Sequence, residues 1–314
     1  MSKTEGKIAG EFILCESPYA ASREAVTILS GQNLDVGAVL GRVALGIGRA
    51  SIPAVVGTGN GLMSLVFAGP DVEEGDYVIT CKTKVTNAGV FSVVAPSGKA
   101  LPDATVAVAY ISSHINFSIA DGSTDFEVGD VFTIVVGTTA PTVIGGTGTG
   151  VMTALSLSPD AKPGRYQVIN RVVVTNGGDF EVLGPDGESI GRFIWTNAGS
   201  TASFTSRQIN FTLSDATDYI AGNYFDVAVY NKGERDKGKG VAWAPGTYDG
   251  RNKVAGILIA AVDASAADKA GVMLARKAVV KGDELTFGAA ISAAEKQVAK
   301  SEMARVLDIF SRAS

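Results

Sequence analysis

The fold is decided by a stretch near the end of the chain, residues 248–287, which reads YDGRNKVAGILIAAVDASAADKAGVMLARKAVVKGDELTF. Turn residues divide it into short apolar runs. Asp249-Gly250 opens the run from Lys253 to Val262, and Lys281-Gly282-Asp283 closes the run from Val272 to Val280. Apolar runs of this length between turn signals predict β-strands. The stretch holds too few apolar residues to close a core alone, so it needs partner strands from elsewhere in the chain.

The partner segment is residues 23–43, REAVTILSGQNLDVGAVLGRV, because no other segment has a similar texture. The two segments are separated by most of the chain. We therefore predict one discontinuous base domain, made of residues 1–55 and 236–314 and interrupted by a long insertion. The overall fold class that this organisation predicts is mainly β.

Both segments also resemble a known family. The sequences SREAVTILSGQNLDVGAVLGRV and GTYDGRNKVAGILIAAVDASAADKAGVMLARKAVV are similar to the head decoration proteins of tailed bacteriophages, the family of the lambda decoration protein D. The resemblance covers residues 8–49 and 241–290 and rests on the turn and glycine pattern. It implies a β-tulip or barrel-like base in a homotrimeric cement protein, which binds the major capsid protein on the outside of a capsid and stabilises it. The expected location is the outer surface of the virion, after synthesis in a host cytoplasm.

The first twenty residues allow two interpretations. Charges and glycines fill MSKTEGKIAGEF, where a signal peptide would need an apolar core, so we expect the mature chain to begin near Met1. The segment is either a frayed terminus or an arm that orders on a partner by adding a strand to a sheet edge. The resemblance favours the arm. The predicted capsid-binding residues are its apolar and aromatic ones: Ile8, Phe12, Ile13, Leu14 and Tyr19.

The insertion is a tandem repeat. Residues 57–98, moved forward by 89 positions, align without a gap on residues 146–187, and 17 of the 42 positions are identical. After a gap of five residues the pairing resumes, with Ile115-Asn116-Phe117 against Ile209-Asn210-Phe211. Alternation puts Phe91 and Val93 on one face of a strand, and Phe180 and Val182 repeat the pattern. Short strands and turns of this kind are typical of immunoglobulin-like β-sandwiches, so we predict two tandem sandwiches, residues 56–140 and 141–235.

The chain ends in a predicted helix. Ser292 and Glu295 have the spacing of a capping box. Ala299, Met303, Val306 and Phe310 then recur at helical intervals, with Leu307 beside them. We expect this stripe to pack on the base domain or on a neighbouring subunit.

Composition excludes several classes of protein. With 46% hydrophobic and 19% charged residues, the chain is neither disordered nor membrane-spanning, and its longest apolar runs have only the length of a strand. A net charge of -5 and a pI near 5.1 disfavour a nucleic-acid partner, because phosphate binding needs clustered Lys and Arg. Cys15 and Cys81 fall in different predicted domains, so no disulfide is expected.

Candidate chemical groups are few. His114 is the only histidine and has no acidic neighbour in sequence, so we interpret it as a surface or strand-edge residue. The glycine-rich runs 57–61 and 145–150 lack the Lys-Ser/Thr of a P-loop, and we interpret them as entry turns of the repeats. Four loop carboxylates could hold calcium, but their spacing differs between the copies and favours ordinary turns: Asp121, Asp125, Asp215 and Asp218. We predict no catalytic residue, no cofactor and no metal.

Trp195 has no aromatic counterpart in the first repeat. It is either a core residue or, if it is exposed, a platform on which a sugar ring could stack. The second case would make the repeats a carbohydrate or host-surface binding module. This function is the alternative to a decoration protein, and a host-surface glycan would then be a further partner.

Overall fold

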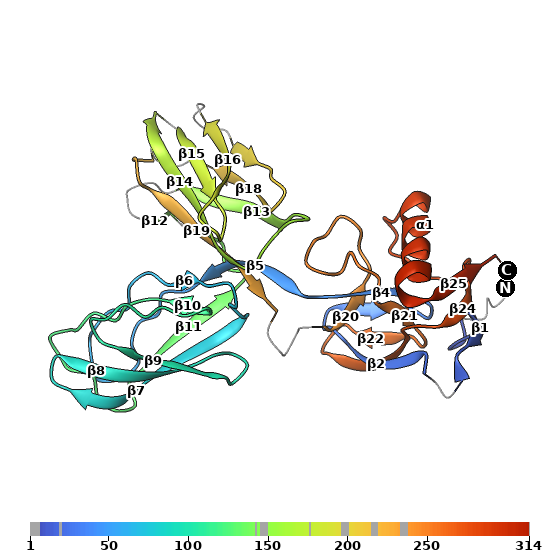
Figure 1. Cartoon of the computed structure of the whole chain (residues 1–314), viewed down its shortest axis with the longest axis horizontal. Helices are drawn as coiled ribbons and strands as arrows, with labels where there is room; N and C mark the ends of the chain where they lie inside the picture. Colours follow the sequence, from blue (N-terminus) through green and yellow to red (C-terminus); the bar gives the residue numbers. More distant parts are fainter. Residues whose placement is uncertain are drawn as a thin grey trace. The chain divides into compact units, whose positions relative to one another are not determined.

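The structure is a computed structural model that describes residues 7–18, 21–141, 143–144, 150–175, 177–195, 201–214, 219–232 and 238–313. Strands dominate these residues, and a helix lies close to the C-terminus (Figure 1). The predicted mainly-β class is confirmed. The chain forms two compact units: unit 1 is Met1–Ala44 with Asp236–Ser314, and unit 2 is Leu45–Arg235. Segments from the two ends of the sequence therefore share unit 1.

A closed barrel forms the centre of unit 1. Alternate residues of its strands point inward, so Val26 and Ile28 are buried. Gly41 is required in the barrel, because a Cβ there would lie 2.3 Å from the backbone oxygen of Arg251. The five barrel strands, in order, are β2 (Arg23–Ile28), β20 (Gly240–Ala242), β4 (Val39–Arg42), β21 (Gly256–Leu258) and β23 (Lys269–Leu274), and a separate two-stranded sheet pairs β22 (Val262–Ala264) with β3 (Gln32–Leu34).

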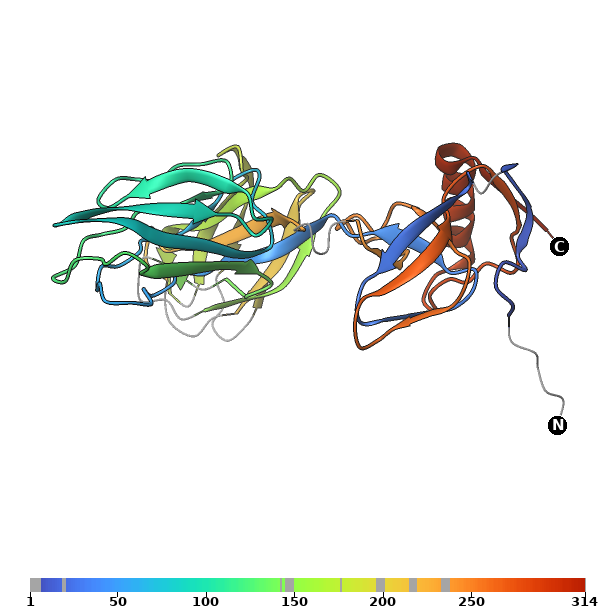
Figure 2. The ribbon, with the colours of Figure 1, turned by 90° about the horizontal axis from the view of Figure 1, so that it is seen from below.

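A three-stranded sheet, here called the terminal sheet, completes unit 1. Its order is β1 (Ile13–Glu16), β24 (Ala278–Lys281) and β25 (Ile309–Arg312), with β1 antiparallel and β25 parallel to β24. Figure 2 shows the blue strand β1 near the red C-terminal elements. Helix α1 (Ala293–Glu302) packs against the same apolar cluster as the inner face of this sheet. That cluster includes Phe12, Val280, Ala299, Met303 and Ile309.

The C-terminal helix begins as predicted and ends earlier. The capping box is confirmed, because the Ser292 hydroxyl accepts from the Glu295 N–H and the Glu295 carboxylate accepts from the Ser292 N–H. After α1 the chain makes a π-helical turn, Met303–Leu307, and Asp308 at φ 57° directs it into β25. Beyond Met303 the predicted stripe is only partly right, because Leu307 packs against the apolar cluster of unit 1 whereas Val306 and Phe310 do not. Val306 and Phe310 are exposed, because the pairing of β25 with β24 buries Ile309 instead.

Unit 2 is built on one ten-stranded sheet, which contains the long strands of both repeats. Its order is β16 (Ser189–Trp195), β15 (Gly177–Leu183), β14 (Gly164–Val174), β19 (Tyr224–Asn231), β5 (Leu45–Ala50), β11 (Val131–Gly137), β7 (Gly75–Val85), β8 (Ala88–Val94) and β9 (Ala100–Thr105), with β12 (Val143–Ile144) beside β19.

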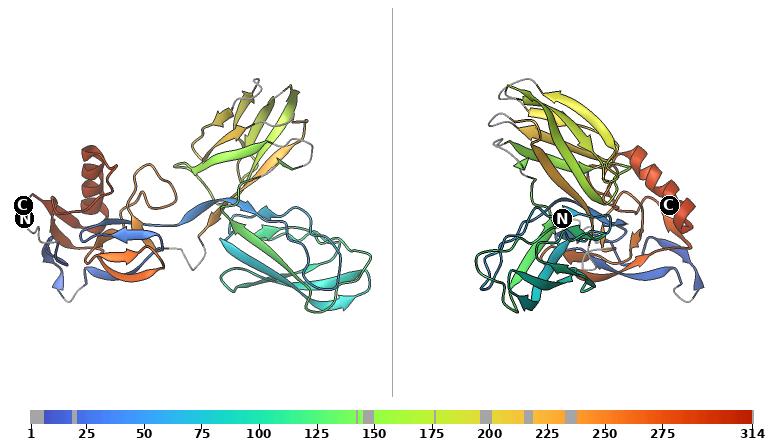
Figure 3. Two further views of the ribbon diagram at one scale, coloured as in Figure 1. Left: turned by 180° about the vertical axis from the view of Figure 1, so that it is seen from behind. Right: turned by 60° about the vertical axis from the view of Figure 1, so that its left-hand side comes forward.

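A second layer adds to each repeat. In the first repeat it contains the pair β6 (Phe67–Ala68) and β10 (Ile115–Asn116), and in the second the sheet β13 (Val151–Leu157), β18 (Ile209–Ser214) and β17 (Thr201–Phe204). Figure 3 shows both repeats from two further sides.

The two repeats have the same strand order, β11–β7–β8–β9 and β19–β14–β15–β16. Their long strands carry a register shift at equivalent positions, between Cys81 and Thr83 in β7 and between Asn170 and Val172 in β14. The repeat found in the sequence is therefore also a repeat of structure.

Strand β5 joins the two repeats, because it pairs with β11 of the first and with β19 of the second. Gly46 makes room for a ring, since a Cβ there would lie 2.1 Å from Tyr230. The sequence-based division assigned this strand to the base, whereas its pairing places it in unit 2. A strand of six residues carries no pattern that identifies its partners, so only the pairing settles where it belongs.

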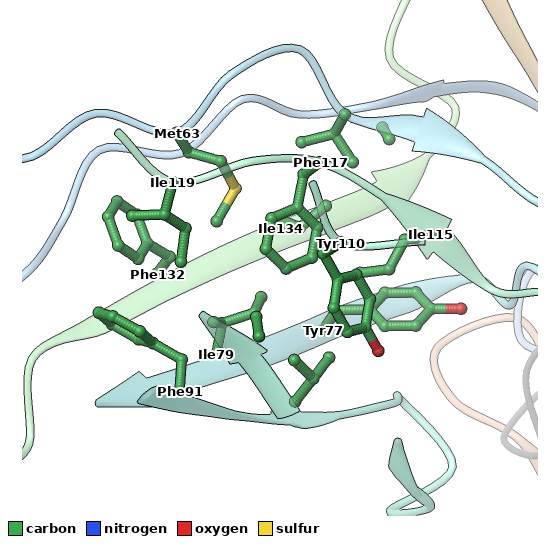
Figure 4. Packing of buried hydrophobic residues seen from close by; sticks show 14 of the residues in the cluster. Met63, Tyr77, Ile79, Phe91, Tyr110, Ile115, Phe117, Ile119, Phe132 and Ile134 are labelled. Atoms are coloured by element: carbon green, nitrogen blue, oxygen red, sulfur yellow. The ribbon is translucent and has the colours of Figure 1, made fainter. Parts of the chain in front are cut away.

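The predicted alternation in β8 and β15 is confirmed, because Phe91, Val93, Phe180 and Val182 are all buried. Figure 4 shows the core of the first repeat, in which Phe91 and Phe132 from the large sheet face Met63 and Ile119 from the second layer.

Candidate functional site

The predicted capsid-binding arm is partly a structural strand of unit 1. Phe12 is 1% exposed and belongs to the apolar cluster under the terminal sheet, and Ile13 packs partly buried against the same cluster. The backbone is anchored as well, because the Lys281 N–H donates to the Phe12 oxygen over 2.8 Å. Phe12 is therefore a core residue, which corrects its assignment as a capsid contact. Sequence could not show this, since the strand that covers Phe12 lies far along the chain.

Two of the predicted contact residues are exposed. Ile8 is 59% exposed and Leu14 is 50% exposed. Leu14 lies at the register shift of β1, between Ile13, which pairs with Val280, and Cys15, which pairs with Val279. Tyr19 lies outside the described residues.

Leu14 belongs to a set of apolar residues that we call the outer face of the terminal sheet: Leu14, Cys15, Val279 and Phe310. Cys15, Val279 and Phe310 form one row, because Val279 pairs with Cys15 on one side and with Phe310 on the other. Their neighbours Val280 and Ile309 point into the core and are fully buried. Phe310 is 50% exposed, so half of a large aromatic side chain stands in solvent. The helical pattern of the sequence missed this residue as a surface contact.

Charged side chains border the apolar row on the same face of the sheet, because Lys281 and Arg312 pair two residues beyond Val279 and Phe310. Lys281 lies 2.9 Å from Glu284, and Glu16 lies 2.5 Å from Arg23. The hydrogen bond from Arg23 lowers the pKa of Glu16, so this carboxylate stays ionised near neutral pH. An apolar surface with a polar border is typical of a protein interaction site.

His114 is buried, which corrects the prediction of a surface or strand-edge residue. Its side chain is 4% exposed, Nδ1 lies 3.4 Å from the Tyr77 hydroxyl, and Nε2 lies 3.4 Å from Lys99 Nζ. Burial lowers the pKa of His114. Folding alone brings these side chains together, because their positions in sequence show no spacing typical of a site.

The first glycine-rich run binds a carboxylate of the chain itself. The N–H groups of Thr58 and Gly59 each donate to Asp130 over 2.8 Å, and the Glu127 N–H donates over 3.0 Å. Burial raises the pKa of Asp130, but these three donors outweigh it and hold the pKa below its usual value. The N–H groups of this loop therefore already have an acceptor within the first repeat. Of the second run, residues 145–149 lie outside the described residues.

The loop carboxylates form no metal site in the described ranges. Asp125 accepts a hydrogen bond from the Asn87 N–H over 3.0 Å, which is a turn contact. Asp215 and Asp218 lie outside the described residues. Among the residues that the structure describes, no group of three or more His, Cys, Asp or Glu side chains could hold a metal ion.

Trp195 is a core residue of the second repeat. It is 4% exposed, and its ring centroid lies 6.2 Å from that of Tyr219. A buried indole cannot stack on a sugar ring, so the carbohydrate site expected for an exposed Trp195 is not at this residue. Within the described segments, no helix is long and apolar enough to cross a membrane.

Comparison with known proteins finds one family. The family model described as bacteriophage lambda head decoration protein D matches residues 2–307. Neither the curated proteins nor the solved structures include a match. The family match covers both units, including the two repeats.

Proposed function

Because the chain belongs to the bacteriophage lambda head decoration protein D family, we propose that it binds the outer surface of a tailed-phage capsid as a trimer and stabilises the shell. The observation that carries this proposal is the family match over residues 2–307. In this proposal unit 1, Met1–Ala44 with Asp236–Ser314, is the capsid-binding base, and the two repeats of unit 2 are immunoglobulin-like domains that protrude from it.

The outer face of the terminal sheet is the proposed contact with the major capsid protein, together with Ile8. Complete burial of a Leu or Phe side chain contributes about 1.5–3 kcal/mol, so burying the exposed halves of Leu14 and Phe310 would contribute roughly 1 kcal/mol each. One such face would bind weakly. A trimer presents three of them at once, and simultaneous contact multiplies the affinity.

Stabilisation of the shell follows from mass action. A ligand that binds the assembled capsid and not its separated subunits favours assembly by an amount that grows with its concentration. No catalytic group is needed for this role, and the family supports a structural one.

The double variant Leu14→Ser/Phe310→Ser tests the contact surface. Both side chains are half exposed, so the variant should keep the trimer and lose no more than about 2 kcal/mol of unfolding free energy. We expect it to bind purified capsids that lack the protein at least tenfold more weakly in a co-sedimentation assay. Light scattering on the free protein measures the number of subunits.

Val298→Ser is the matched control, because Val298 is 61% exposed on α1 and lies outside the outer face. This variant should bind capsids like the wild type. Equal binding by the double variant and the control would refute the outer face as the contact. If the wild-type protein stayed in the supernatant when capsids sediment, under all conditions tested, the decoration function itself would be refuted.

A further inference from the structure

The second layer of the first repeat has an exposed face that the decoration function does not use. In the middle segment of this layer, residues 117–120, Ile119 pairs with Met63 on one side and Phe117 pairs with Tyr110 on the other. These four side chains are buried and belong to the core shown in Figure 4. Because side chains alternate along extended segments, their neighbours point away from the core. We call these exposed or half-buried neighbours the Leu62–Ile111 face: Leu62, Ser64, Ala107, Ala109, Ile111, Ser118 and Ala120.

Two large aliphatic side chains occupy opposite corners of this face. Leu62 is 71% exposed and Ile111 is 79% exposed. The Ala120 N–H donates to the Leu62 oxygen over 2.8 Å, so Leu62 lies beside the end of the middle segment. Ile111 lies beside the beginning of that segment, because it follows Tyr110, which pairs with Phe117. Between the two corners the face contains only Ala and Ser side chains.

The face is uncharged although the domain that carries it is acidic. Residues 59–69 and 104–120, from which the face is built, contain no Lys, Arg, Asp or Glu. Residues 56–140 as a whole contain nine Asp and Glu against three Lys. Two copies of this repeat therefore repel each other when other surfaces meet, but not when their Leu62–Ile111 faces meet. Charge thus favours this face as the place where a second copy can approach.

The second repeat builds the same layer with hydroxyl side chains. Its register is equivalent, because Met152 pairs with Leu213 and Phe204 pairs with Phe211. The Ser203 and Thr212 hydroxyls lie 3.1 Å apart on its exposed side. A layer covered by hydroxyls therefore folds on this framework, so folding does not require the large aliphatic side chain of Ile111. Apart from one valine, the residues that correspond to the face are all Thr or Ser: Val151, Thr153, Thr201, Ser203, Thr205, Thr212 and Ser214.

We propose that two copies of the chain associate through their Leu62–Ile111 faces. A face with large side chains at opposite corners and small ones between them is self-complementary. In a two-fold arrangement Leu62 of each copy meets Ile111 of the other, and the Ala and Ser side chains let the two layers pack closely. A two-fold contact joins copies in pairs and cannot close a trimer, so it links one proposed trimer to another.

The contact is small. It contains seven residues from each copy, whereas a standard protein interface contains about 20–30 residues a side. We therefore expect weak association of the free protein, which increases with its concentration. Where copies lie close together on one surface, as the proposed function requires, the high local concentration strengthens the same contact.

Cross-linking of the full chain tests the contact. Ser118 lies at the centre of the face, and packed sheets lie about 10 Å apart, so a short bismaleimide can join two copies that carry Ser118→Cys. Cys15→Ser is the background, because Cys15 is exposed whereas Cys81 is buried. We expect covalent dimers whose yield rises with protein concentration, and a cross-linked assembly with twice the starting mass in sedimentation. Thr212→Cys, at the corresponding position of the second repeat, is the matched control and should cross-link at least tenfold less.

A substitution at one corner tests the same contact through its charge. Ile111→Asp, added to Ser118→Cys, brings two like charges into an uncharged contact and should lower the yield of dimers at least tenfold. Ile111→Thr copies the residue of the second repeat and should lower the yield at least threefold. Thr205→Asp, the matched control in the second repeat, should change the yield less than twofold, and circular dichroism checks that each variant keeps the fold.

Three results would each overturn the proposal: equal cross-linking of Ser118→Cys and Thr212→Cys, an unchanged yield for folded Ile111→Asp and Ile111→Thr, or a cross-linked assembly that keeps the starting mass. Capsids are absent from this assay, so its outcome leaves the decoration function untouched.

Discussion

Phe12→Ala separates a core residue from a capsid contact. Phe12 is 1% exposed and packs in the cluster that also contains Val280 and Trp243. Removing a buried Phe ring loses its transfer free energy and leaves a cavity, which together lower the free energy of unfolding by about 3–5 kcal/mol. We expect this loss in unit 1. Leu14→Ala, at a half-exposed neighbour, should lower it by roughly 1 kcal/mol or less.

Urea unfolding followed by tryptophan fluorescence measures the difference. The chain has two tryptophans, Trp195 in unit 2 and Trp243 in unit 1, so the background Trp195→Phe leaves a signal from unit 1 alone. The free energy of unfolding falls by about 2 kcal/mol per molar urea, so a variant that loses about 4 kcal/mol of it should unfold with a midpoint roughly 2 M lower in urea.

If Phe12→Ala shifted the midpoint no more than Leu14→Ala and still abolished capsid binding, Phe12 would belong to a free arm. The packing of the terminal sheet against α1 described above would then be refuted, and with it the assignment of the outer face.

Two further predictions concern buried groups of the first repeat. His114 has a lowered pKa in the folded state, so the unfolded chain binds more protons as the pH falls below about 6.5, and unit 2 should lose stability there. His114→Gln, the residue of the second repeat, should reduce the fall in melting temperature between pH 7.5 and 5.5; an equal fall in both proteins would contradict the assignment. Asp130→Asn removes the charge that accepts three backbone N–H groups and should lower the free energy of unfolding by about 1.5–3 kcal/mol at pH 7. Because the folded-state pKa of Asp130 is lowered, this contribution to stability is present above about pH 3.8 and lost below it. The difference in unfolding free energy between wild type and Asp130→Asn, measured by urea unfolding, should therefore shrink near pH 3. A difference that stayed constant with pH would contradict this role of Asp130.

Patterns that repeat within a short window were predicted well. Phe91 and Val93 alternate within a single strand, and the capping box of Ser292 and Glu295 lies within one helical turn. In both cases the interacting groups are close in sequence, so the pattern contains the structure. The match between residues 57–98 and 146–187 likewise needed no coordinates.

The errors share a physical cause. Phe12 and Phe310 were placed on an arm and on a helix, and both predictions depended on the neighbouring residues alone. Both segments instead pair with strand β24, which lies between β1 and β25, so that Phe12 is buried and Phe310 is half exposed on a strand. His114 was expected at a surface or strand edge because nothing in its sequence context identifies Tyr77 and Lys99 as its neighbours.

The sequence by itself determined the mainly-β class, the duplicated insertion and the family, because these follow from residue order and from short-range periodicity. Only the tertiary structure decided which apolar residues are core and which remain exposed, and that strand β5 joins the two repeats. Burial depends on contacts between segments far apart in sequence, such as the pairing of Ile13 with Val280, and no local pattern specifies those contacts.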